Sequence, residues 1–351
     1  MPQPKAFSPL PLAGEGWEGV DSPPRRVMLR FAVIRLTESL IVLLVISFAV
    51  YGLIGLMPGD PIDIMVQSDP DLTPADAERL KALYGLDQPV VVRYWNWLGA
   101  ALQGDFGFSR THMRPVLEIL WPRLWNSLLL LGVSEVLAIA IAIPIGVYAA
   151  VRPYSVFDYA VNLACFAGIS VPPFWLALMM MILFSITLGW LPAGGMGPVT
   201  ADAGWWDSLP YLVLPVATLT IVSVGGFTRF MRASMLQTLR QDFIRTAQAK
   251  GLDNRRVVWG HALQSAIVPL VTVLGLSFGA VFSGALITEI MFGWAGIGRM
   301  TYDSILASDY NLALVGLLFA TAMTLLGNLL ADIAYVWLDP RVSFRSLETG
   351  R

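Results

Sequence analysis

The stretch RTAQAKGLDNRRVVWGHALQSAIVPL, residues 245–270, is a charged segment, broken by a glycine, between two long apolar runs. The residues before Gly251 are good helix formers, and glycine permits the left-handed turn that commonly ends a helix. A second helix can begin with Asp253 or Asn254 as its cap. Its apolar side would carry Val257, Val258, His261 and Ala262. The stretch therefore predicts a hairpin of two short helices joined at a glycine.

The composition of the 351-residue chain indicates a membrane protein. Hydrophobic residues make up 56% of the chain and charged residues 14%, with a mean hydropathy of +0.65. This is more apolar surface than one soluble core can hide. The formal net charge of −2 argues against a polyanionic partner such as nucleic acid. Cys165 is the sole cysteine, so the chain can form neither an internal disulfide nor a cysteine metal site.

Six apolar runs are long enough to cross a hydrocarbon core of about 30 Å as helices. We therefore expect an all-α membrane protein with six transmembrane helices. The third run contains Pro172 and Pro173, and we interpret it as one kinked helix because its first part alone is too short to cross. The runs cover approximately residues 40–57, 128–151, 159–188, 209–230, 266–290 and 312–338.

The basic residues that flank these runs predict the orientation, because short basic loops stay in the cytoplasm. Both termini and residues 232–265 are expected in the cytoplasm, and residues 58–122 outside. Tryptophans near the outer ends of the runs fit an interfacial belt or packing within the outer loop. The cytoplasmic flanks contain Arg25, Arg26, Arg30, Arg35, Arg152, Arg229, Arg232, Arg240, Arg245, Lys250, Arg255, Arg256, Arg341 and Arg345.

The chain divides into segments of different character. The proline-rich start has no helical period and predicts a disordered tail, and translation could equally begin at Met28. The outer loop contains TPADAERLKALYG, in which Thr73 can cap a helix that Gly85 ends. We expect a tail at 1–27, a first span at 28–57, an extracytoplasmic helical domain at 58–124, a core with five spans at 125–338 that includes the cytoplasmic loop 232–265, and a cytoplasmic tail at 339–351.

Two functions fit the hairpin equally well on spacing alone. A loop that merely joins two spans needs only a few residues, so a compact helical hairpin suggests that another protein docks there. Alternatively, its basic residues could rest on anionic lipid.

The same stretch resembles a known motif. DFIRTAQAKGLDNRRVVWGHALQSAIVP, residues 242–269, is similar to the EAA loop of ABC importer permeases, in the form found in the dipeptide, oligopeptide and nickel branch. Gly251 matches the glycine of the motif, and Thr246, Ala247 and Gln248 stand in its E-A-A places. The proline of the general pattern is displaced to Pro269, a departure that the peptide branch shares.

Four other segments resemble the same branch, so the resemblance covers nearly the whole chain from 28 to 344. FAVYGLIGLMPGDP, residues 48–61, resembles the end of its first span, and YGLDQPVVVRYWNWLGAALQGDFGFS, residues 84–109, resembles its outer domain. MFGWAGIGRM, residues 291–300, resembles its last outer loop, and NLLADIAYVWLDPR, residues 328–341, resembles its C-terminal end. Five matches in order make this resemblance specific.

The resemblance implies a type I ABC importer permease fold in the bacterial inner membrane. The chain would be one of two permease subunits of an ATP-driven importer, completed by two cytoplasmic ATPases and an extracytoplasmic solute-binding protein. Peptides are the expected substrate, and nickel complexes, glutathione or sugars are alternatives. ATP and Mg would bind the ATPases, because this chain contains no G-x-x-x-x-G-K-[ST] loop and we expect no cofactor on it. The hairpin would fit a cleft on the ATPase through Arg245, Thr246, Ala247, Gln248, Ala249, Lys250, Gly251 and Leu252.

Other classes of function fit less well. An ion-coupled secondary transporter usually shows inverted repeats with paired broken spans, and the two halves of this sequence show none. An intramembrane enzyme would need a catalytic pair at membrane depth, and neither histidine lies within a predicted span. We therefore expect no catalytic residue and no metal site.

Two acids within the spans are candidates for a further role. Glu135 could line a polar path or contact the second permease, and we hold these equally open. Asp332 shares a helix face with Asn328 and Tyr335 near the cytoplasmic end. For Asp332 we favour a structural hydrogen bond or ion pair over a role in transport.

Overall fold

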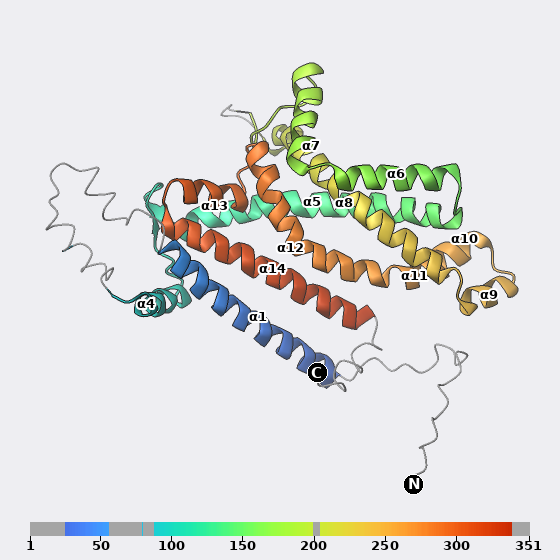
Figure 1. The fold of residues 1–351 in the computed structure, drawn as a ribbon, viewed down its shortest axis with the longest axis horizontal. Helices are drawn as coiled ribbons and strands as arrows, with labels where there is room; N and C mark the ends of the chain where they lie inside the picture. The colour runs from blue at the N-terminus through green and yellow to red at the C-terminus, as the bar shows by residue number, and fades with distance from the viewer. Residues whose placement is uncertain (1–24, 56–78, 80–87, 199–203, 339–351) are drawn as a thin grey trace, which may run out of the picture.

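The computed structural model describes residues 25–55, 79, 88–198 and 204–338. Within these residues the chain is helical apart from one two-stranded ribbon, and the helices form an elongated bundle (Figure 1). The segments predicted as tails, 1–27 and 339–351, lie largely or wholly outside the described residues, as do Thr73 and Gly85 of the outer loop.

Four long helices of the described chain are apolar enough to cross a membrane, or five if a bent pair is counted as one span. The most extensive packing is that of α5 against α8. A further helix, α12 (Val268–Met291), occupies the fifth predicted position, and the count of six spans stays a prediction. The four long helices are α1 (Arg25–Ile54), α5 (Val116–Val151), α8 (Trp205–Thr238) and α14 (Tyr310–Leu338).

The third predicted span is not a single kinked helix, as the sequence led us to expect. It forms α6 (Val156–Ser170) and α7 (Pro173–Met180), which continues as the π-helix η1 (Met181–Thr187), and α6 and α7–η1 meet at an angle of 101°. Consecutive prolines explain the break, because Pro172 restricts the residue before it to an extended backbone and neither proline supplies an N–H group. Val171 accordingly has φ −79° and ψ 124°. In Figure 1, α7 points away from the bundle.

The predicted outer segments and the predicted cytoplasmic hairpin lie at opposite ends of the bundle (Figure 1). The end predicted to lie outside, called the outer end below, contains α4 (Val90–Leu102), α13 (Ile297–Leu306) and the ribbon of β1 (Phe108–Ser109) and β2 (Arg114–Pro115). The other end contains α9 (Asp242–Ala249) and α10 (Asn254–Arg256). α5 begins at Val116, within the range assigned to the outer domain.

A buried carboxylate fastens the outer ribbon to the turn before α14. Asp309 is 1% exposed and accepts hydrogen bonds from the hydroxyl groups of Ser109 (2.5 Å) and Thr111 (2.7 Å) and from the Thr111 N–H (3.0 Å). Burial opposes ionisation of Asp309, but these bonds favour the charged form and hold the pKa of its carboxyl below the usual range.

The tryptophans of the outer segments divide into two groups. Most are well exposed at the rim, as an interfacial belt requires. Trp294, by contrast, is 3% exposed in the core, where its Nε1–H donates to the Asn126 carbonyl at 3.1 Å. The interfacial belt stays a prediction for the exposed set, and Trp294 packs in the core instead. The exposed set is Trp95, Trp121, Trp125, Trp190, Trp205 and Trp206.

Candidate functional site

The predicted hairpin is present, and it is built around a left-handed glycine. α9 ends at Ala249, Gly251 has φ +80°, and α10 begins at Asn254. The side chain of Asp253 caps the second helix by accepting a hydrogen bond from the Arg255 N–H at 3.2 Å. After α10 the backbone continues through the π-helix η2 (Val257–Ala262) into α11 (Leu263–Ala266).

The turn between the two helices is a Schellman motif. The Gly251 N–H donates to the Gln248 carbonyl at 2.9 Å, and the Leu252 N–H donates to the Ala247 carbonyl at 3.4 Å. These two bonds satisfy carbonyl groups that the end of α9 would otherwise leave unpaired. The motif requires a left-handed backbone at the residue after the helix cap, which here is Gly251. A Cβ added to Gly251 would meet nothing within 4 Å, so its backbone angle, and not lack of space, requires glycine.

One face of the hairpin belongs to the hydrophobic core of the bundle. Ile244 and Ala247 of α9 and Val257 of η2 are buried with Met231 and Met235 of α8. The hydroxyl of Ser234 in α8 also donates to the Ala266 carbonyl at 2.7 Å, which ties the far leg of the hairpin to the same helix. The hairpin therefore forms one packed unit with the end of α8.

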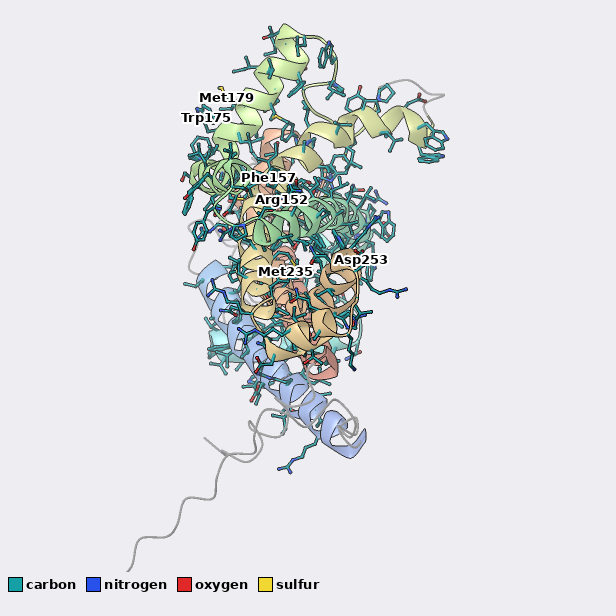
Figure 2. All side chains as sticks on the ribbon, turned by 90° about the vertical axis from the view of Figure 1, so that its right-hand side faces the viewer. Arg152, Phe157, Trp175, Met179, Met235 and Asp253 are labelled. Carbon is teal, nitrogen blue, oxygen red and sulfur yellow. The ribbon has the colours of Figure 1, made fainter. Side chains whose placement is uncertain are left out.

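The other face is open and carries most of the residues predicted for docking. Leu252 is half-buried and Ala247 is buried in the core, so these two residues pack the inner side of the turn and are not available for docking. His261, which we had expected on the apolar side with Val257, is exposed instead. Figure 2 looks onto this end of the molecule and labels Asp253 on the hairpin. The exposed predicted residues are Arg245, Thr246, Gln248, Ala249, Lys250 and Gly251.

The two acids singled out within the spans lie away from the hairpin. Glu135 is half-buried in the middle of α5, and its role in a path or an interface stays a prediction. Asp332 of α14 forms an ion pair with Arg35 of α1, with Nε and Oδ2 3.2 Å apart. The expected structural ion pair of Asp332 is therefore confirmed.

Besides Asp309, sequence reasoning missed two other buried carboxylates. Asp158 at the start of α6 pairs with Arg232 of α8, and Glu289 at the end of α12 accepts hydrogen bonds from the Ser127 hydroxyl and the Arg299 N–H. A feature of the sequence could have drawn attention to each of these two acids. Ser155 and Asp158 have the spacing of a capping box, and Glu289 is the one acid of its apolar run, directly before a glycine-rich loop.

Comparisons with known proteins agree with this architecture. Residues 142–344 match the family described as binding-protein-dependent transport system inner membrane component, and residues 28–122 match the family of the N-terminal part of such membrane components.

Several relatives align along almost their whole length. The oligopeptide transport system permease protein AppB of Bacillus subtilis (strain 168) is 37% identical over 318 residues, which cover 90% of this chain and 100% of the relative. The dipeptide transport system permease protein DppB of Escherichia coli (strain K12) is 34% identical over 337 residues, covering 90% and 99%. A putative peptide permease of Brucella suis biovar 1 is 37% identical over 316 residues, covering 90% and 99%.

The family match covers more than half of the chain and includes the hairpin, the bent α6–α7 pair and α14. Together with the all-α bundle and its long apolar helices, it identifies a multi-pass transport subunit with the type I permease fold. The chain belongs to the family of inner-membrane components of binding-protein-dependent transport systems, the permeases of ABC importers.

Proposed function

We propose that this chain is a peptide permease: one of two membrane subunits that together form the translocation path of an ATP-driven importer. The names of the similar permeases, which refer to oligopeptides and dipeptides, support the substrate class. A second permease, two cytoplasmic ATPases that bind ATP and Mg, and an extracytoplasmic solute-binding protein complete the assembly. Nickel complexes, glutathione and sugars are the competing substrates.

The observation that carries the proposal is the two-faced hairpin. Its apolar face is fixed in the permease core, and its open face carries small and neutral groups beside the charged ones, including Thr246, Gln248 and Ala249. A surface that only rests on anionic lipid gains its affinity from basic residues, at about 1 kcal/mol each. A mixed surface around a rigid turn is better suited to a protein cleft. We infer that the ATPase contacts this open face and that movement of the docked hairpin drives alternating access.

Reconstitution of the permease with the ATPases, second permease and binding protein of the same importer tests the function. We expect a peptide-loaded binding protein to stimulate ATP hydrolysis and to deliver labelled peptide into proteoliposomes. Stimulation by a nickel complex, glutathione or a sugar, with no response to peptides, would establish the corresponding alternative. Co-purification of the chain without any ATPase would contradict the importer itself.

The orientation of the chain gives a separate prediction. Met113 at the outer ribbon is 79% exposed, and Arg255 on the hairpin is also exposed. In a Cys165→Ala background, a membrane-impermeant maleimide should label Met113→Cys in intact cells and Arg255→Cys only after permeabilisation. The reverse pattern would place the hairpin outside, where no ATPase could reach it.

A further inference from the structure

A buried ion pair joins α6 to α8 at the hairpin end of the bundle. Asp158 is 2% exposed; its Oδ1 lies 2.5 Å from Arg232 Nε and its Oδ2 2.7 Å from Arg232 Nη2. Two parallel hydrogen bonds between a guanidinium and a carboxylate fix the orientation of the groups as well as their separation. The pair therefore constrains both helices more strongly than a single contact would.

On the α6 side, the same carboxylate organises the turn from α5. Its Oδ2 accepts the Tyr154 N–H and its Oδ1 accepts the Asn162 side-chain amide, both at 2.9 Å. The Asp158 N–H donates to the Ser155 hydroxyl at 3.2 Å. Tyr154 itself has φ +63°, an uncommon angle for a residue other than glycine, and the hydrogen bond from its N–H helps to hold that turn. Asp158 is thus fixed to α6 and to the α5–α6 turn.

On the α8 side, Arg232 belongs to the segment that carries the hairpin. It lies next to Met231, which is fully buried in the core that contains Ile244 and Val257 of the hairpin. Two residues after Arg232, the Ser234 hydroxyl donates to the Ala266 carbonyl. Any displacement of the hairpin must therefore move Arg232 with it.

A second contact holds α6 against α8, and the two helices run in opposite directions. A Cβ added to Gly225 of α8 would lie 2.9 Å from the Cys165 carbonyl oxygen, so the two backbones touch there. Beyond Ser170 the chain breaks at the two prolines and α7 leaves at 101°. α6 is consequently secured to α8 near both of its ends, and the break before α7 is the first point at which the chain can hinge.

We propose that Asp158 and Arg232 are positioning residues for transport, which transmit displacement of the hairpin from α8 to α6 and through the break to α7. The inference rests on the proposed function, since it assumes that an ATPase moves the hairpin. The pair acts through the helices that it joins and touches neither nucleotide nor substrate. Its loss should separate ATP hydrolysis from uptake without releasing the ATPase.

The test measures uptake per ATP hydrolysed in the reconstituted importer. Asp158→Ala alone would leave the half-buried Arg232 without its partner, which can destabilise the fold, so the main variant is the double substitution Asp158→Ala with Arg232→Met. Coupling between distant sites typically corresponds to 5- to 150-fold effects, and we expect uptake per ATP to fall at least about fivefold. Arg232→Lys keeps the charge but cannot form two parallel hydrogen bonds to the carboxylate. Its uptake per ATP should fall less than that of the double variant.

A matched control is the exposed pair of Arg114 in β2 and Glu118 in the first turn of α5, which lie 3.0 Å apart and only four positions apart in the sequence. Glu118→Gln should leave uptake per ATP unchanged. Wild-type uptake per ATP in the double variant would overturn the inference, and so would a loss of uptake that merely follows a loss of protein or of bound ATPase. If the wild-type chain holds no ATPase, the proposed function itself fails, which is a different result.

Discussion

Gly251→Val is expected to release the ATPase from the permease while the chain still inserts in the membrane. Gly251 has φ +80°, and a β-branched residue in the left-handed region is a genuine outlier. The conformation costs roughly 1–2 kcal/mol or more for a residue with a Cβ. A destabilisation of this size changes the population of a local conformation by a factor of roughly 5–30. The Schellman bonds at Gly251 and Leu252 would open, and the exposed turn would lose its shape.

Two substitutions at the same turn serve as controls. Gly251→Asn should be much milder, because asparagine adopts left-handed angles more readily than other residues with a Cβ. Lys250→Ala removes an exposed charge, and exposed pairs contribute roughly 0–1 kcal/mol. The measurements are the amount of ATPase that co-purifies and the rate of substrate-stimulated hydrolysis. If the hairpin rests on lipid, the order should be the opposite, with Lys250→Ala more damaging than Gly251→Val. Wild-type amounts of co-purified ATPase and wild-type hydrolysis rates in Gly251→Val would contradict the docking proposal.

The hairpin could be predicted because its determinants are local. Glycine at the turn, an Asp cap and a period of apolar residues specify two helices and their inner face before any tertiary contact is known. The one misplaced residue, His261, shows the limit of this argument. The chain forms a π-helix at 257–262, and the wider turn shifts the faces relative to the 3.6-residue period that the prediction assumed.

The presence of the long helices was predicted better than the residues at which they begin and end. Hydropathy locates the apolar centre of a span, but a helix continues into polar residues wherever tertiary contacts hold it. α5 therefore starts at Val116 and not near 128, and α8 extends to Thr238, where its last turns pack against the hairpin. The two prolines at 172–173 predicted a kink in the helix. The angle of the bend could not be predicted, because it depends on what α7 packs against.

The buried ionic contacts were the main omission, for a physical reason. Asp158 and its ion-pair partner Arg232 are 74 positions apart, and Glu289 and its hydrogen-bond donor Ser127 are 162 apart. No local pattern indicates which distant residue will be the partner of a buried acid. What can be inferred is that such a partner exists, since an unpaired charge at this depth is costly. Applied to Asp332, that argument succeeded. Applied to every acid within a predicted span, it would have identified Glu289 as well, but not Asp158, which directly precedes the third predicted span.

Gly296→Ala is expected to destabilise the outer end of the permease, although it adds only a methyl group. A Cβ on Gly296 would overlap the carboxylate of Glu289, which is 1% exposed. That carboxylate accepts from the Ser127 hydroxyl at 2.5 Å and from the Arg299 N–H at 3.0 Å, and Ser127 in turn accepts the Ile297 N–H at 2.8 Å. The methyl group must displace Glu289 and break this network. Leaving a buried carboxyl group without its hydrogen-bond partners costs about 1–3 kcal/mol.

Gly132→Ala in α5 provides the matched comparison, because a Cβ at Gly132 meets nothing within 4 Å. Alanine in the interior of a helix is about 1 kcal/mol more favourable than glycine, so this variant should be as stable as wild type or more so. For Gly296→Ala, a loss of about 3 kcal/mol should lower the Tm in detergent by roughly 4 °C. Equal Tm values for the two alanine variants would mean that the loop at 293–299 can move away from Glu289 at little cost. Glu289 would then not be what holds the outer loop to the membrane core.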